Sequence, residues 1–168
     1  MKIGRGVSAE KRGERLAGFV YGTIVVLSVV IAGAKAFPHG MGHIASLVVI
    51  TTFVFWLAHV YAHSLGHSVG AGEHLSFPEV QRIAWREAAI MGAAVPPVAV
   101  LLLGELGVLS PHAAVWGALA VGLAVLAAEG ILFARIEKLG LLATLVVVAM
   151  NVGLGLVLIL LKLLVTHY

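Results

Sequence analysis

The sequence predicts an all-α integral membrane protein, a bundle of five transmembrane helices forming a single domain over residues 1–168. Hydrophobic residues make up 61% of the chain and charged residues 11%, whereas an ordinary soluble domain is about a quarter charged. The mean hydropathy is +1.07. Five apolar runs of roughly 20 residues or more are each long enough to cross a hydrocarbon core of ~30 Å. The lipid bilayer is therefore the first partner that we expect.

The residue types that are missing exclude several classes of function. The chain has no cysteine, which excludes disulfides, thiolate metal sites and cysteine nucleophiles. It also has no aspartate and no Gly-x-Ser-x-Gly motif, so a serine nucleophile would lack its usual setting. The basic residues are scattered among the ends of the apolar runs, where they set topology rather than bind nucleic acid. We expect neither an enzyme nor a nucleic-acid-binding protein.

The five predicted spans follow one another along the chain. They cover residues 16–36, 42–65, 88–108, 112–133 and 139–165. Nine of the eleven Lys and Arg residues fall on one side of such an arrangement: Lys2, Arg5, Lys11, Arg12, Arg15, Arg82, Arg86, Arg135 and Lys138. Because basic flanks stay in the cytoplasm, we expect a cytoplasmic N-terminus and an exoplasmic C-terminus in a prokaryotic plasma membrane. One span more or fewer would place the C-terminus in the cytoplasm.

The third predicted span is preceded by a polar segment and is interrupted by two prolines. Ser76-Phe77-Pro78-Glu79 is a capping box with proline in the first turn, which predicts a helix that begins there. Arg82 and Arg86 follow Glu79 at helical spacing and indicate an amphipathic lead-in on the cytoplasmic surface. Pro96-Pro97 then removes two backbone donors, which predicts a kink near residues 92–94. Either neighbouring helices satisfy the backbone carbonyls that the kink frees, or the kink is a hinge or a break that lines a ligand site.

Three histidines recur every four residues in the second span: His59, His63 and His67. A step of four residues turns about 40° past a full helical turn, so the three form a slowly winding stripe on one face. Histidine is costly in hydrocarbon and titrates near neutral pH, which makes the stripe a candidate functional feature. Three interpretations stay open: hydrogen bonding between helices, proton handling or gating beside a pore, and a metal site.

The metal interpretation takes His59, His63 and His67 as ligands of a divalent ion such as zinc. The spacing His-x-x-x-His on a helix is common among zinc ligands. Such a site needs further ligands or orienting carboxylates, and Glu73, His74 and Glu129 are the candidates.

Two other polar residues lie inside the predicted spans. Glu129 is about one turn from the inner end of the fourth span, level with the stripe, and we expect it to be the stripe's charge partner. Asn151 lies in the middle of the fifth span, where its amide must find a partner in a neighbouring helix or line a wet cavity. The candidate pore or proton-handling set is therefore Trp56, His59, His63, His67, Glu129 and Asn151.

A second polar group is predicted at the exoplasmic ends of the spans. It comprises His39, His43, Glu105 and His112. These residues either converge on an outer vestibule or face water separately at the membrane interface.

Two segments resemble a known family when they are read together. The first span opens with Arg15-Leu16-Ala17-Gly18-Phe19, and the second carries Phe55-Trp56 with His59 three residues later. This resembles the endolysosomal-type potassium channels and their bacterial relatives, whose helices carry Arg-x-x-x-Phe-Ser-Asp and Phe-Trp-x-x-His. The resemblance implies that Arg15, Phe19, Trp56 and His59 join the first two helices.

The same resemblance implies that residues 24–27 lie on or near a pore helix with an aliphatic constriction. Val20-Tyr21 stands where the family has Ser-Asp, and the family's bacterial members usually have six spans. Potassium selectivity is therefore not implied.

The leading functional prediction is a small ion-conducting or proton-responsive channel or transporter, with a monovalent cation or proton as the transported species. A second is a divalent-metal-binding or metal-transporting membrane protein. A third is a non-catalytic scaffold or accessory subunit. We also expect a homo-oligomer, because small residues are frequent in the spans and five helices rarely enclose a pathway alone.

Overall fold

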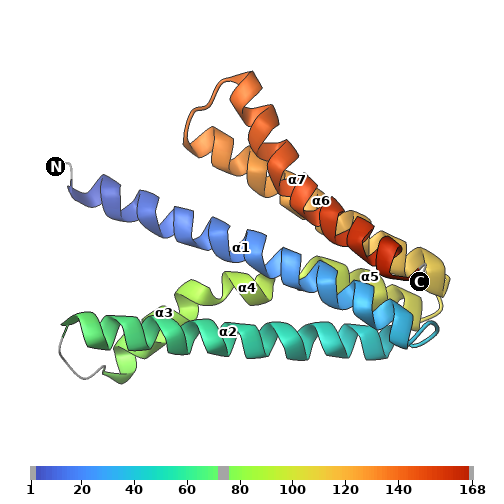
Figure 1. The fold of residues 1–168 in the computed structure, drawn as a ribbon. Helices are drawn as coiled ribbons and strands as arrows, with labels where there is room; N and C mark the ends of the chain where they lie inside the picture. The colour runs from blue at the N-terminus through green and yellow to red at the C-terminus, as the bar shows by residue number, and fades with distance from the viewer. Residues whose placement is uncertain (1–2, 72–75, 167–168) are drawn as a thin grey trace.

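The computed structural model describes residues 3–71 and 76–166, which form helices and no strand within those ranges (Figure 1). The helices are α1 (Ile3–Ala36), α2 (Met41–Ala71), α3 (Phe77–Glu87), α4 (Ala89–Gly92), α5 (Val95–Glu105), α6 (Pro111–Ile136) and α7 (Leu141–Thr166). The predicted all-α class is confirmed.

Four stretches within α1, α2, α6 and α7 are long and apolar enough to cross a membrane. They are Arg15–Ala36, Met41–Ser68, Pro111–Ile136 and Leu141–Leu160. A fifth crossing exists if the bent pair Phe77–Gly92 and Val95–Glu105 is one span. The beginning of α1 and the end of α7 lie at opposite ends of the bundle, as an odd number of crossings requires (Figure 1).

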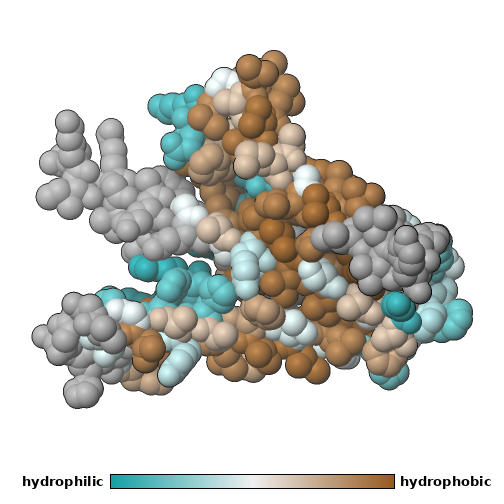
Figure 2. Space-filling model, viewed as in Figure 1, coloured by the Kyte–Doolittle hydropathy of each residue, from teal (hydrophilic) through white to brown (hydrophobic). Residues whose placement is uncertain are grey.

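We name the two ends of the bundle after the predicted orientation. The inner end holds the beginning of α1, the end of α2, helix α3 and the connection between α6 and α7 (Figure 1). The outer end holds the connections from α1 to α2 and from α5 to α6. The apolar side chains on the outside of the bundle cover much of the surface in view (Figure 2).

Helix α3 begins at the predicted capping box. The carboxylate of Glu79 accepts hydrogen bonds from the hydroxyl of Ser76 at 2.7 Å and from its backbone N–H at 2.8 Å. These two bonds hold the pKa of the exposed Glu79 carboxyl below its usual range, because they favour the charged form. Ser110 caps α6 in a simpler way, since its hydroxyl accepts from the Ala113 N–H at 3.2 Å.

The segment predicted as the third span is bent where the prolines predict it. Helix α4 ends at Gly92, α5 begins at Val95, and the segments Phe77–Gly92 and Val95–Glu105 are bent by 47° relative to each other. The residues just before the break pack closely on α1 at a glycine, since a Cβ built on Gly22 would lie 2.7 Å from the Ile90 carbonyl oxygen. Only glycine lets the two backbones approach this closely. The predicted kink is confirmed, and α1 supports it from one side.

The buried core is concentrated toward the outer end. Leu27 of α1 fills the space left by two glycines, because Cβ atoms on Gly122 of α6 and Gly155 of α7 would lie 2.6 Å and 3.3 Å from its methyl carbons. The other fully or nearly fully buried members come from α1, α2, α5 and α6: Val26, Val30, Met41, Ile44, Val48, Leu101, Ala114, Ala118 and Leu126. Glycine at these positions allows close helix packing.

The helices separate toward the inner end. Helices α6 and α7 lean away from α1, while α3 stays beside the end of α2 (Figure 1). The inner parts of α2 and α7 consequently carry few buried side chains, with Val60 the buried apolar residue of α2 beyond Thr52. This divergence creates the space in which the polar residues lie.

Candidate functional site

The histidine stripe of α2 borders α1 and α3 at the inner end. His59 is half-buried, and its Nδ1–H donates to the carbonyl of Phe55 at 3.0 Å. The ring of Tyr21, from α1, lies 4.9 Å from the His59 ring. The rings of His59 and His63 are 6.4 Å apart and nearly perpendicular. His59 is thus held by its own helix and by an aromatic contact, rather than by a charged partner.

His63 makes a short polar contact with a carboxylate of α3. Its Nδ1 lies 2.7 Å from Oε1 of Glu87, the last residue of α3. The side chain of Glu87 is 9% exposed, whereas that of His63 is 60% exposed. One end of this pair is therefore buried in the protein and the other is open to the surroundings.

The expectation that Glu129 partners the stripe is wrong. Helix α6 packs on a different side of α1 from α2, so Glu129 lies away from the histidines, and Glu87 takes its place. The sequence held a signal for this. Glu87 follows Val80, Ile83 and Ala84 at spacings of seven, four and three residues, which places a carboxylate on the apolar face of the amphipathic lead-in.

Three of the four residues to which the family resemblance points, Phe19, Trp56 and His59, contact neighbouring helices, and Arg15 is the exception. Nε1–H of Trp56 donates to the carbonyl of Ala84 in α3 at 3.0 Å. Phe19 packs on α4, since a Cβ on Gly92 would lie 3.0 Å from its ring. His59 contacts Tyr21, the residue that stands where the family has aspartate. Arg15 is exposed and lines a cavity on the other side of α1.

Two of the four residues at the implied constriction are not available to a pathway. Val26 and Leu27 are 0% exposed in the core of the chain. Ile24 and Val25 remain half-buried.

The exposed part of the stripe lies beside a cavity of about 330 Å³. His63, His67 and Arg86 line it together with Gly66. Within residues 3–71 and 76–166, no three His, Asp or Glu side chains are grouped so that they could hold a metal ion. The proposed ligands Glu73 and His74 lie outside the described residues. The described structure therefore gives the stripe no metal-binding geometry.

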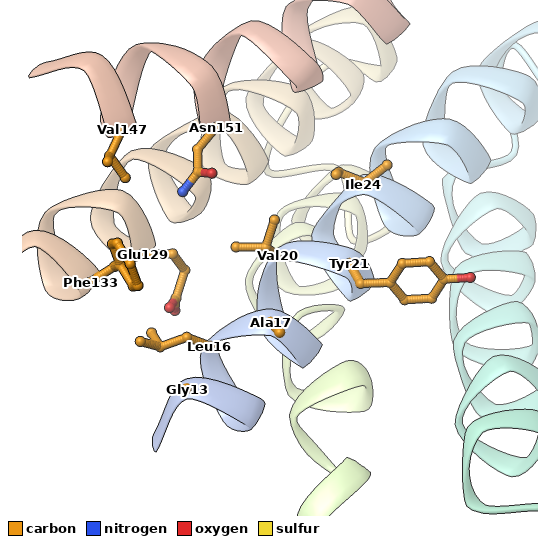
Figure 3. A pocket seen from close by; sticks show the side chains of 10 residues that line it. All are labelled: Gly13, Leu16, Ala17, Val20, Tyr21, Ile24, Glu129, Phe133, Val147 and Asn151. Atoms are coloured by element: carbon orange, nitrogen blue, oxygen red, sulfur yellow. The ribbon is translucent and has the colours of Figure 1, made fainter. Parts of the chain in front are cut away.

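Glu129 and Asn151 occupy a second polar place, between α1 and the pair α6–α7. Both side chains point into a cavity of about 450 Å³ (Figure 3). Oε2 of Glu129 is buried and has no hydrogen-bond partner. Nδ2 of Asn151 donates to the Leu126 carbonyl at 3.4 Å, which gives the amide the partner in a neighbouring helix that its depth requires. Tyr21 points away from this cavity toward α2 (Figure 3).

The residues of the predicted outer group make three separate sets of contacts. His39 and His112 line one cavity of about 440 Å³ together with Ser110. Glu105 instead accepts the N–H of Gly42 at 2.6 Å, which satisfies a free donor at the beginning of α2. The ring of His43 stacks on Phe37 at 5.3 Å. These side chains are exposed, and the first two share a cavity.

Comparisons with family models, with curated proteins and with solved structures found no match to this chain. Its function is therefore inferred from its own side chains and their arrangement.

Proposed function

We propose that this chain is a proton-responsive membrane channel or transporter, in which protonation of His63 at the inner end controls the broken third span. The observation that carries the proposal is the 2.7 Å contact between His63 and Glu87. Protons or a monovalent cation are the transported species. The membrane position is a bundle of five spans with a cytoplasmic N-terminus.

The contact is sensitive to the proton concentration at the inner end. Glu87 is nearly buried, and a buried carboxylate is stable only with hydrogen bonds and a compensating charge. Protonated His63 supplies both, whereas neutral His63 supplies a hydrogen bond alone. Histidine is the residue type whose charge changes near neutral pH, so the proposal expects the strength of the contact to follow the cytoplasmic pH. Other titratable or charged groups nearby are His59 and His67 on α2 and Arg86 on α3.

The contact is also placed where it can move the span. Glu87 is directly followed by the four-residue helix α4 and the 47° break. The break packs on Gly22 of α1, and Trp56 fixes the preceding turn through Ala84. A change at Glu87 therefore acts on α2 directly, through His63, and lies three residues before Ile90, which packs on Gly22 of α1. The His63–Glu87 contact and the break that follows it, which we call the His63–Glu87 joint, form a suitable two-state element for gating.

The pathway itself requires more than one copy of the chain. The interior of a single copy is filled by the outer core, with Val26 and Leu27 fully buried. We therefore propose a homo-oligomer with a pathway between its subunits. Of the residues at the implied constriction, the half-buried Ile24 and Val25 of α1 then face this pathway. This part of the proposal rests on the family resemblance.

The test is flux through protein reconstituted in liposomes, measured as the internal pH is varied from 5 to 8. The wild type is expected to pass protons or a monovalent cation at a rate that changes with internal pH. His63→Gln, which cannot be charged, should give a rate that no longer follows pH. His67→Gln is the matched control, since it removes an exposed histidine one turn away and should keep the wild-type profile.

Two results would overturn the proposal. One is the absence of any flux between pH 5 and 8, and the other is an unchanged pH profile in His63→Gln. A double change of His59 and His63 to alanine separates the alternatives. Lower thermal stability with unchanged flux would favour a scaffold, and loss of stoichiometric zinc binding would favour a metal-binding protein.

A further inference from the structure

The crevice between α1 and the pair α6–α7 has the size and lining of a small-molecule site. Its volume of about 450 Å³ lies within the range of such sites, roughly 300–1,000 Å³. The walls are apolar, with Leu16, Val20 and Ile24 on α1 facing Phe133 and Val147 on the other two helices (Figure 3). An apolar ligand body fits these walls.

The polar groups of the crevice come from Glu129 and Asn151. The carboxylate of Glu129 is the one acid among the described side chains that line it, and Oε2 is buried without a hydrogen-bond partner. Asn151 donates one N–H to the Leu126 carbonyl, which leaves its amide oxygen as a second acceptor and its other N–H as a donor. A buried oxygen of this kind costs free energy until a donor or a cation meets it.

We propose that this crevice binds an amphipathic organic monocation, a protonated amine whose apolar body fills the cavity and whose ammonium group meets Glu129 and Asn151. An anion would be repelled by the carboxylate of Glu129. A neutral hydrocarbon would leave Glu129 without a partner. A bare divalent ion would lack ligands, since no group of three suitable side chains exists in the described parts of the chain. The site lies outside the His63–Glu87 joint and does not depend on the proposed transport.

Arg15 is the internal competitor for the same carboxylate. It lines an adjoining cavity of about 350 Å³ that also reaches Glu129. Its side chain is exposed and flexible, so it can withdraw toward water while a ligand enters. Removing this guanidinium should therefore leave amine binding unchanged or make it tighter.

The experiment measures equilibrium binding to the full chain in lipid nanodiscs, with empty nanodiscs as the blank. The probe is 1-adamantylamine, protonated at pH 7, and its neutral counterpart is 1-adamantanol. The wild type should bind the amine saturably, one per chain, and more tightly than the alcohol. Glu129→Gln should weaken amine binding at least tenfold, about 1.4 kcal/mol, and leave the alcohol unchanged.

Two further variants keep the result interpretable. Glu137→Gln removes an exposed carboxylate at the end of the same helix and should bind the amine as the wild type does. Ala17→Phe keeps Glu129 but fills the cavity from an exposed position on α1, and it should lose both probes while eluting as a folded protein. Arg15→Gln should bind the amine at least as tightly as the wild type.

Three outcomes would overturn the proposal. The first is equal amine binding by Glu129→Gln and the wild type, which would mean that the charge is not used. The second is an equal loss in Glu137→Gln, which would indicate general attraction to acidic surface. The third is equal affinity for amine and alcohol, which would make the crevice a simple hydrocarbon groove.

Discussion

The outer and inner halves of the bundle are built on different principles. In the outer half, side chains of α1, α2, α5 and α6 interlock around Leu27 and Leu101, which are 0% exposed. In the inner half, one span is broken, two helices lean away, and the carboxylates of Glu87 and Glu129 lie among partly packed side chains. Apolar contact holds the first half, and specific polar contacts shape the second.

The outer half therefore accounts for most of the stability, and the groups to which we assign a response to protons or ligands lie in the inner half. Closely packed interiors resist change, because each displaced side chain forfeits many contacts. Regions with few buried contacts open at lower free energy and supply the moving parts of proteins. The pair His63–Glu87 and the cavity at Glu129, where we propose that a proton and a ligand act, both lie in the less packed half.

The largest expected effect comes from making a cavity in the outer half. Leu27→Ala should lower the free energy of unfolding by about 2–5 kcal/mol, because Leu27 fills the space beside Gly122 and Gly155. Leu145→Ala is the control in the inner part of α7, where the leucine is 56% exposed, and should cost less than about 0.5 kcal/mol. Denaturant titration in detergent, followed by circular dichroism, measures both. Equal losses would remove the distinction between the halves.

An intermediate effect, of opposite sign in the two halves, is expected from adding one methyl group. A Cβ on Gly104 would lie 2.5 Å from the Cβ of Ala114, so Gly104→Ala should destabilise the outer half by about 1–3 kcal/mol. A Cβ on Gly66 meets nothing within 4 Å, so Gly66→Ala should stabilise by up to about 1 kcal/mol through helix propensity. Thermal unfolding midpoints of the two variants report the signs. A stabilised Gly104→Ala would show that the outer packing is looser than described.

The smallest expected effect concerns the first turn of α3. Hydrogen bonds from Ser76 lower the pKa of Glu79 in the folded state, so their stabilisation is present above the usual value of 4.5 and is lost as the pH falls through the lowered pKa. Amide-exchange protection over residues 80–83 should therefore decrease in acid. Ser76→Ala should reduce both the protection and its pH dependence.

The matched control for this change is Ser110→Ala. It removes a helix cap that involves no carboxylate, so any loss of protection at the beginning of α6 should be independent of pH. An identical pH dependence in both variants would show that Glu79 is not the titrating group.

Features that depend on neighbouring residues in the chain were predictable from the sequence. The helix start at Ser76 follows from the capping box, and the break after Gly92 follows from the two prolines, since each acts within one or two helical turns. The apolar lengths of α1, α2, α6 and α7 are likewise local properties. Asn151 was expected either to find a partner in a neighbouring helix or to line a wet cavity, and it both donates to the Leu126 carbonyl and lines a cavity.

Features that depend on which helices are neighbours were not predictable in the same way. Glu87 and Glu129 both lie near the inner end, so depth alone did not decide which carboxylate meets His63. The choice follows from α3 packing beside α2 while α6 packs on another side of α1. The contact between Tyr21 and His59 is of the same kind, because it requires the rotation of α1 about its axis, which hydrophobic periodicity did not reveal.

The length of α1 has a mechanical consequence. Its 34 residues span about 51 Å, well beyond the ~30 Å of a hydrocarbon core. The part of α1 from Val26, in the outer core, to Ile3 is about 35 Å long, so a tilt of about 5° about that core would move its inner end by about 3 Å. Glu129 lies against one side of α1, and His59 contacts Tyr21 on another. A tilt of α1 would therefore change the crevice at Glu129 and the contact at the histidine stripe together.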